Sequence, residues 1–201
     1  MSLCSSKKLG AVFENDWMSN IDGLMFCLRS LSVRNNFGKV INSDVAFIQL
    51  HKITQNIRKR KNRIYFIGNG ASASIASHIS ADLAKNAYIH TEVFTDISLM
   101  TALANDLSYE EVFSEPLRHR MTKGDMLVII SSSGNSPNVL RGAKTAKELG
   151  GTVITLSAIK EDNRLRQMGD LNFYVSAQTY ALAETSHAAI LHFWVDQVIK
   201  E

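Results

Sequence analysis

The chain has 201 residues, which suits one compact domain with a helical extension and leaves little room for a second domain. Hydrophobic residues make up 45% and charged residues 20%, with only 2 prolines, so a mainly disordered chain is excluded. A net charge of +3, from 22 basic and 19 acidic residues, does not indicate a nucleic-acid-binding protein.

The sequence contains neither a membrane segment nor a nucleic-acid-binding tract. Apolar runs of about 18 residues, the length that a membrane helix needs, do not occur. Charged residues between Lys7 and Asp16 interrupt the stretch where the apolar core of a signal peptide would lie. The dense basic cluster at residues 58–63 falls at a predicted helix end, where cations favour the helix dipole. We therefore expect a cytoplasmic protein with neither a membrane nor a nucleic acid as its partner.

Two helical patterns come first along the chain. Apolar residues recur at spacings of three and four over residues 9–31, and again over residues 44–58. Ser43 or Asp44 is expected to cap the second helix. The pattern predicts an N-terminal helical arm, residues 1–60, that packs on its own domain or on a partner subunit.

After residue 61, short β-branched runs alternate with helical patterns, which is typical of an α/β domain. The predicted strands cover residues 63–67, 91–95, 126–131, 152–156 and 172–175. The predicted helices cover residues 72–86, 97–104, 109–118, 137–149, 163–168 and 182–199. Residues 61–201 are thus expected to form a three-layer, flavodoxin-like domain with a parallel sheet of about five strands.

Two predicted strands run into turns rich in glycine and serine. The first turn reads GNGAS, residues 68–72, and the second reads SSSGNS, residues 131–136. Ligands of a parallel sheet gather at the carboxyl ends of its strands, beside helix N-termini that favour anions. The residues expected to bind a phosphate group there are Asn69, Gly70, Ala71, Ser72, Ser131, Ser132, Ser133 and Ser136. Alternatively, the small residues merely close two tight turns.

Neither turn matches a nucleotide-binding motif. The Walker pattern G-x-x-x-x-G-K-[ST] does not occur, and Ala73 breaks the Rossmann pattern G-x-G-x-x-G. No nucleotide cofactor is therefore expected.

Groups that can transfer protons or bind metals follow the first turn and recur on the last predicted helix. His78 and Asp82 are four residues apart, so they share a helix face that suits a metal ion or a proton-transfer pair. Glu184, His187 and His192 are the candidates on the last helix, with a structural role favoured for His187. Glu184 and His192 lie about 12 Å apart along a continuous helix. They can share an ion only if Glu184 precedes the helix or if several subunits build the site.

The two turns, with the intervening Ala104-Asn105-Asp106, resemble the SIS, or sugar isomerase, domain family. The resemblance runs from about residue 44 to the C-terminus and is strongest to the phosphoheptose isomerases. It implies conversion of sedoheptulose 7-phosphate to a D-glycero-D-manno-heptose 7-phosphate. It also implies a homo-oligomer, with a tetramer favoured and active sites at subunit contacts.

The resemblance further implies one metal ion per active site, held by His78, Asp82, Glu184 and His192. These nitrogen and oxygen donors suit zinc. Where this chain has Asp82 and Glu184 the family has Glu and Gln, and Ala181-Leu182 replaces an Asp-Arg pair. The departures fall at the sugar end of the site, so another heptose or a shorter ketose phosphate is an alternative substrate.

In this interpretation a proton moves between C1 and C2 of the sugar through a cis-enediol. Asp82 is assigned as the base and His192 as the assisting acid, while Asn105, Asp106, Asp82 and Glu184 also bind the substrate. Asp106 could instead cap the helix predicted near Tyr109. A non-catalytic SIS adaptor or sensor acting through a protein partner is the main alternative, although an adaptor has no need of these four metal- or proton-capable side chains. A sugar-phosphate-responsive regulator is weaker, since no basic recognition helix precedes the domain.

Overall fold

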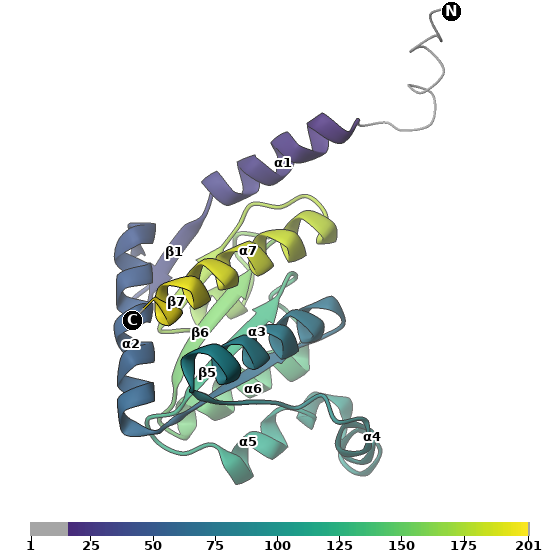
Figure 1. Ribbon diagram of the computed structural model, residues 1–201. Coiled ribbons are helices and arrows are strands. Elements are labelled where there is room, and N and C mark those ends of the chain that lie inside the picture. The colour runs from purple at the N-terminus through teal and green to yellow at the C-terminus, as the bar shows by residue number, and fades with distance from the viewer. Residues whose placement is uncertain (1–15, 201) are drawn as a thin grey trace, which may run out of the picture.

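A seven-stranded sheet with helices on both faces forms the body of the protein (Figure 1). The computed structural model describes residues 16–200. The strands are β1 (Ser32–Asn35), β2 (Val40–Ile41), β3 (Arg63–Gly68), β4 (His90–Val93), β5 (Met126–Ser131), β6 (Thr152–Ser157) and β7 (Leu171–Tyr174). Their order is β2-β1-β7-β6-β5-β3-β4. Strands β3 to β7 pair in parallel, whereas β1 runs antiparallel to both β2 and β7.

The helices cover both faces of this sheet. They are α1 (Trp17–Arg29), α2 (Ser43–Arg60), α3 (Ala71–Ala87), α4 (Ile97–Asp106), α5 (Ser114–Arg120), α6 (Pro137–Glu148) and α7 (Tyr180–Ile199), with 3-10 turns η1 (Tyr109–Glu111) and η2 (Leu165–Gln167). Within residues 16–200, no helix combines the length and apolar character that crossing a membrane requires.

The central strands explain the three layers. Successive side chains of a strand point to opposite faces, and strands β3 and β5 are buried on both. Ile64 and Phe66 pack with α3 and α7 on one face, whereas Tyr65 and Ile67 pack with α5 and α6 on the other. The predicted α/β class and three-layer order are thereby confirmed, and the five predicted strands match β3 to β7 to within two residues.

Strands β1 and β2 were not predicted, so the sheet has seven strands rather than about five. Both are too short and too polar to show an alternating pattern: β1 reads Ser-Val-Arg-Asn and β2 has two residues. The Asn35 side chain forms the turn between them by accepting hydrogen bonds from the backbone N–H groups of Phe37 and Lys39, each at 3.0 Å. Both strands lie within residues 1–60, and the division of the chain at residue 60 stays a prediction.

Several helix boundaries differ from expectation. Asn42 caps α2 by accepting from the N–H groups of Asp44 and Val45, so the predicted cap at Ser43 or Asp44 is wrong. The helix predicted at residues 109–118 is divided into η1 and α5, and the one predicted at residues 163–168 is only the short turn η2. The first predicted helix corresponds to α1, and its residues 9–15 lie outside the described part of the chain.

Candidate active site

The first glycine-containing turn joins β3 to α3 by a close approach of backbone segments. A Cβ atom on Gly68 would lie 2.8 Å from Ser72 Cβ and 2.9 Å from the Ile130 carbonyl oxygen, so a side chain there does not fit. Gly70 occupies the N-cap position of α3 with a φ of 57°, a conformation that favours glycine, and it provides no side-chain cap. The turn therefore brings the N-terminus of α3 against the end of the neighbouring strand β5.

The second turn, residues 131–136, is named here the serine loop. It follows β5, and Gly134 within it has a φ of 62°. The Gly134 N–H donates to both the carbonyl oxygen and the Oγ atom of Ser131, at 3.0 and 3.2 Å. Ser136 is the N-cap residue of α6 and makes no side-chain capping bond, while Pro137 begins the helix. The loop thus ends at a helix N-terminus whose cap hydroxyl is available to a ligand.

Asparagine side chains join the two turns. Asn69 Nδ2 donates to Asn138 Oδ1 at 3.0 Å, and Asn138 Nδ2 donates back to Asn69 Oδ1 at 2.9 Å. The hydroxyl of Tyr109 also donates to Asn69 Oδ1, at 3.2 Å. Sequence reasoning did not identify Asn138 or Tyr109. An asparagine buried at the start of a helix is a weak signal because the pattern alone does not say what it contacts.

The two turns and the start of α7 enclose a pocket of about 140 Å³, named here the serine pocket. Its lining residues are Asn69, Ser72, Ser131, Ser132, Ser133, Ser136, Tyr180 and Glu184. Ser132 is 5% exposed, and its Oγ atom has no hydrogen-bond partner among residues 16–200. Because a buried polar atom is normally paired, this hydroxyl is available to a ligand of the pocket. The pocket offers several neutral hydroxyl donors, which suits an anion.

Two larger cavities, of about 410 and 360 Å³, lie elsewhere on the protein. The first lies between α2 and α7 and the second between α4 and α5, and no serine within residues 16–200 lines either of them. Size alone therefore does not identify the site, whereas the convergence of hydroxyl groups does.

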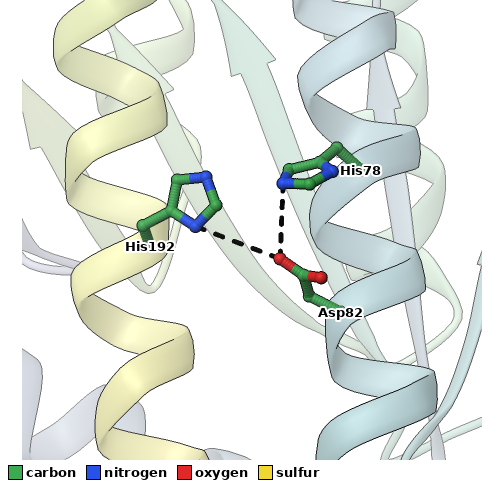
Figure 2. Close-up of side chains that lie close together, drawn as sticks. All are labelled: His78, Asp82 and His192. Carbon is green, nitrogen blue, oxygen red and sulfur yellow. Dashed lines mark ion pairs between the residues drawn. The ribbon is translucent and has the colours of Figure 1, made fainter.

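The second element of the site is a carboxylate between two histidines (Figure 2). Asp82 Oδ2 lies 3.4 Å from His78 Nε2 and 4.0 Å from His192 Nδ1. His78 and Asp82 project from α3 and His192 from α7, and the two helices lie side by side. One ligand atom from each of the three residues lies within 4.8 Å of the others, which makes this group a possible metal site. The arrangement can also transfer protons, since the carboxylate lies between two imidazoles.

Glu184 lies apart from this three-residue group. It lines the serine pocket and is the only charged residue among the lining residues described. Glu184 and His192 both belong to the continuous helix α7. This excludes the first of the two predicted ways in which they could share an ion, namely that Glu184 lies before the helix. Its predicted role as a metal ligand therefore needs a second subunit.

The serine pocket and the histidine–carboxylate group are separated along the same two helices. Ser72 and Glu184 line the pocket, whereas Asp82 and His192 lie further along α3 and α7. At 1.5 Å per residue, Glu184 and His192 are separated by about 12 Å along α7. The arrangement fits a ligand that has an anionic group at one end and its reacting atoms at the other.

Asn105 and Asp106 are not among the residues that line the serine pocket. They end α4, where Asn105 Nδ2 donates to Asp106 Oδ1 at 2.9 Å, and Asp106 lines the cavity between α4 and α5. Asp106 does not cap the following turn, because the N-cap residue of η1 is Ser108. Their predicted role in substrate binding stays a prediction, as does that of Gly70 and Ala71, which start α3.

His187 is a buried histidine on α7 that lies outside both groups. It is 1% exposed, and neither of its ring nitrogens has a hydrogen-bond partner within residues 16–200. Burial lowers the pKa of His187 to about 4, an effect that the neighbouring backbone of Ser157 partly offsets. The imidazole is therefore neutral at pH 7, which accords with the structural role favoured for it.

The buried state of His187 predicts acid sensitivity. Its folded pKa of about 4 lies below the ordinary histidine pKa of 6.5, so the unfolded chain takes up the proton first as the pH falls. The contribution of the neutral His187 side chain to the free energy of unfolding is fully present above pH 6.5 and is lost as the pH falls toward the folded pKa. Between pH 7.5 and pH 5 we expect His187 to lower the free energy of unfolding by about 2 kcal/mol.

Urea unfolding of the native protein and of His187→Leu at both pH values measures this effect. The variant is expected to lose less stability on acidification than the native protein. His90→Gln, at an exposed position, is the matched control and should keep the native pH dependence. Equal pH dependence in the native protein and His187→Leu would contradict the assignment.

Comparisons with known proteins identify the family. The model of the SIS domain matches residues 42–158. A phosphoheptose isomerase of Helicobacter pylori is 32% identical over 144 residues, covering 69% of this chain and 74% of the relative. One of Campylobacter concisus is 35% identical over 140 residues, covering 67% and 74%.

Solved structures agree with the sequence comparisons. The phosphoheptose isomerase of Neisseria gonorrhoeae superposes with a TM-score of 0.70 at 28% identity, over 77% of this chain and 85% of that one. A phosphoheptose isomerase of Francisella tularensis has a TM-score of 0.78 over 99% and 100% of the two chains, and at 22% identity it supports the fold alone. The chain thus belongs to the SIS domain family, and its relatives place it with the phosphoheptose isomerases.

Proposed function

We propose that the protein is an aldose–ketose isomerase that converts sedoheptulose 7-phosphate to D-glycero-D-manno-heptose 7-phosphate. The observation that carries the proposal is the position of Asp82, between two histidines and further along α3 than the serine pocket. A heptose 7-phosphate has its phosphate at C7 and its reacting carbons at C1 and C2. The separation of the two groups along α3 and α7 suits such a substrate, and the relatives named above are phosphoheptose isomerases.

The serine pocket is proposed to bind the phosphate group. Ser132 Oγ has no hydrogen-bond partner among residues 16–200, the Ser136 hydroxyl makes no capping bond to α6, and the N-terminus of α6 favours an anion. Binding the phosphate far from the reacting carbons provides energy that holds those carbons in place.

The proton transfer is proposed to use Asp82 and His192. The Asp82 carboxylate removes a proton from C1 of the ketose, the C1–C2 double bond of the enediol forms, and His192 protonates the oxygen on C2. Asp82 then returns its proton to C2, while His192 takes back the proton of the oxygen on C1, which leaves the aldehyde. The 4.0 Å between Asp82 Oδ2 and His192 Nδ1 supports this assignment, because a base and an acid this close can act on adjacent carbons of one sugar.

A zinc ion is proposed to belong to this site. His78, Asp82 and His192 offer nitrogen and oxygen atoms within 4.8 Å of one another, a donor set that zinc accepts. Glu184 of a second subunit is proposed as a further ligand. When bound, the ion would polarise the oxygens on C1 and C2 and thereby make the C–H group more acidic.

A homo-oligomer, with a tetramer favoured, is proposed as the active form. Helix α1 supports this proposal because Trp17, Met18 and Phe26 are each more than 60% exposed. Such apolar side chains on one helix are typical of a surface that another subunit covers. The resemblance to phosphoheptose isomerases favours four subunits.

The proposed activity is tested by isomerisation in deuterated water. After elemental analysis of its metal content, the purified protein is incubated with sedoheptulose 7-phosphate and the products are observed by NMR. We expect deuterium at C2 of a heptose aldose phosphate, and we expect its loss in His192→Ala. Phosphosugar binding without exchange would contradict the heptose assignment. A screen of other ketose phosphates would then separate a different isomerase from a non-catalytic adaptor.

A further inference from the structure

The connection between β6 and β7 contacts the serine loop along its length. The Ala158 N–H donates to the carbonyl oxygen of Ser132 at 3.1 Å, and the Leu165 N–H donates to that of Gly134 at 2.9 Å. The Arg164 N–H donates to Asn135 Oδ1 at 3.1 Å. Three residues of the serine loop thus accept hydrogen bonds from one other segment of the chain.

Asn163 lies at the centre of this contact. It is 2% exposed, and its Nδ2 atom donates to the Lys160 carbonyl oxygen at 2.7 Å and to Ser157 Oγ at 3.1 Å. Its Oδ1 atom accepts from the Arg166 N–H at 3.0 Å. The same oxygen fills the space beside Gly134, where even a Cβ atom would collide with it. Asn163 therefore stabilises the conformation of the connection through its hydrogen bonds and packs against Gly134 of the serine loop.

Arg166 anchors the connection to the rest of the sheet. Its guanidinium group is buried, donates to Ser32 Oγ at 2.8 Å and to Glu161 Oε1 at 3.0 Å, and lies 4.2 Å from the centre of the Tyr174 ring. Because Ser32 is in β1 and Tyr174 in β7, the segment that holds Asn163 is attached to two strands. Asn163 is thus held by a segment that is bonded to the sheet.

We propose that Asn163 is a positioning residue that preorganises the serine loop for phosphate. This inference rests on the proposed function, because it takes phosphate to be the ligand of the serine pocket. A loop with glycine in the left-handed region has many alternative conformations, and fixing them on binding costs entropy. Asn163 removes this cost before the ligand arrives, so its contribution appears in phosphate affinity rather than in the proton-transfer step.

The test compares two buried asparagines that each support a glycine turn. Asn172 accepts from the Gly169 N–H at 2.8 Å, donates to the Gly169 carbonyl oxygen at 2.9 Å and is 1% exposed. It lies in β7, two strands away from β5, and its side chain bonds to Thr155, Gly169 and Arg34, which all lie outside the serine loop. Asn172→Ala is therefore expected to cost at least as much stability as Asn163→Ala, while its contacts leave the serine loop unchanged.

For each protein, calorimetric titration with inorganic phosphate gives its Kd, and isomerisation of sedoheptulose 7-phosphate gives kcat and KM. Asn163→Ala is expected to raise the phosphate Kd and the KM about tenfold while kcat changes by less than about twofold. Asn172→Ala should leave all three values near those of the native protein. Asn135→Ala is the second test, to be used if Asn163→Ala does not fold. It changes an exposed residue and removes the hydrogen bond from the Arg164 N–H to the serine loop, so it is also expected to raise the phosphate Kd.

Native phosphate affinity in Asn163→Ala would overturn the positioning role, as would native affinity in Asn135→Ala if only that variant folds. If these variants also turn over the sugar at the native rate, the proposed function is unaffected. An equal loss of affinity in Asn163→Ala and Asn172→Ala would also overturn it, since general destabilisation would then explain the effect. A native protein that neither binds phosphate nor isomerises the sugar would overturn the proposed function and this inference with it.

Discussion

Replacing Asp82 with Asn is expected to lower kcat by about a thousandfold and to leave phosphate affinity nearly unchanged. The amide has the size of the carboxylate but cannot accept the proton from C1 of the sugar. The serine pocket lies at the N-terminal end of α3 and Asp82 is not among its lining residues, so the phosphate group should still bind. Isomerisation kinetics and calorimetric titration with inorganic phosphate measure the two effects separately.

Two further variants define the role of Asp82. Asp82→Glu keeps a carboxylate that can accept the proton and adds only one methylene group, so it should retain much of the activity. Asp22→Asn, an exposed carboxylate on α1, is the matched control and should behave like the native protein. The metal content of each variant is measured in parallel, because a lost ion would also lower kcat. Full activity of Asp82→Asn would rule out Asp82 as the base.

Replacing Gly134 with Ala is expected to weaken phosphate binding about a hundredfold, because two hydrogen bonds to a charged ligand, at about 1.5 kcal/mol each, would be lost. Gly134 has a φ of 62°, which disfavours any side chain, and a Cβ atom would collide with the Asn163 side chain. The serine loop must move to relieve the collision, and the hydroxyl groups of Ser132 and Ser136 then no longer converge. The Kd for inorganic phosphate measures the loss.

Gly38 provides the control for backbone strain alone. Its φ is 74°, but no atom lies within 4 Å of an added Cβ, so Gly38→Ala adds strain without a collision. Phosphate affinity should be native in this variant. In the double variant Gly134→Ala with Asn163→Ala, the two closest contacts, with Oδ1 and Cγ of Asn163, are removed and only the Cβ atom remains, at 2.9 Å. Part of the affinity should therefore return relative to Gly134→Ala. A phosphate Kd in Gly134→Ala equal to that in Gly38→Ala would contradict the role of close packing.

The sequence was sufficient for features that depend on neighbours along the chain. Strand β5 reads as an unbroken apolar run because both of its faces are buried, and the serine loop follows it directly. His78 and Asp82 share a helix face because four residues make about one turn of a helix. The glycine- and serine-containing turns, the parallel sheet and the pairing of His78 with Asp82 on α3 could therefore be predicted with no knowledge of distant contacts.

Other features depend on contacts between residues far apart in the sequence. His192 reaches Asp82 only because α3 and α7 pack side by side, and Glu184 lies at the serine pocket because α7 is continuous from residue 180. Strand β1 has a single buried apolar residue, so its pairing with β7 is not marked by alternating apolar residues in the sequence.

Asn163 illustrates the same limit within the candidate site. In the sequence it is one polar residue in a polar connection, about thirty positions after Gly134. In the folded protein its amide is almost completely buried and packs beside that glycine. Local patterns determine which residues can bind or react, whereas tertiary packing decides which of them meet, since burial and hydrogen bonding between distant segments leave no periodic signal in the sequence.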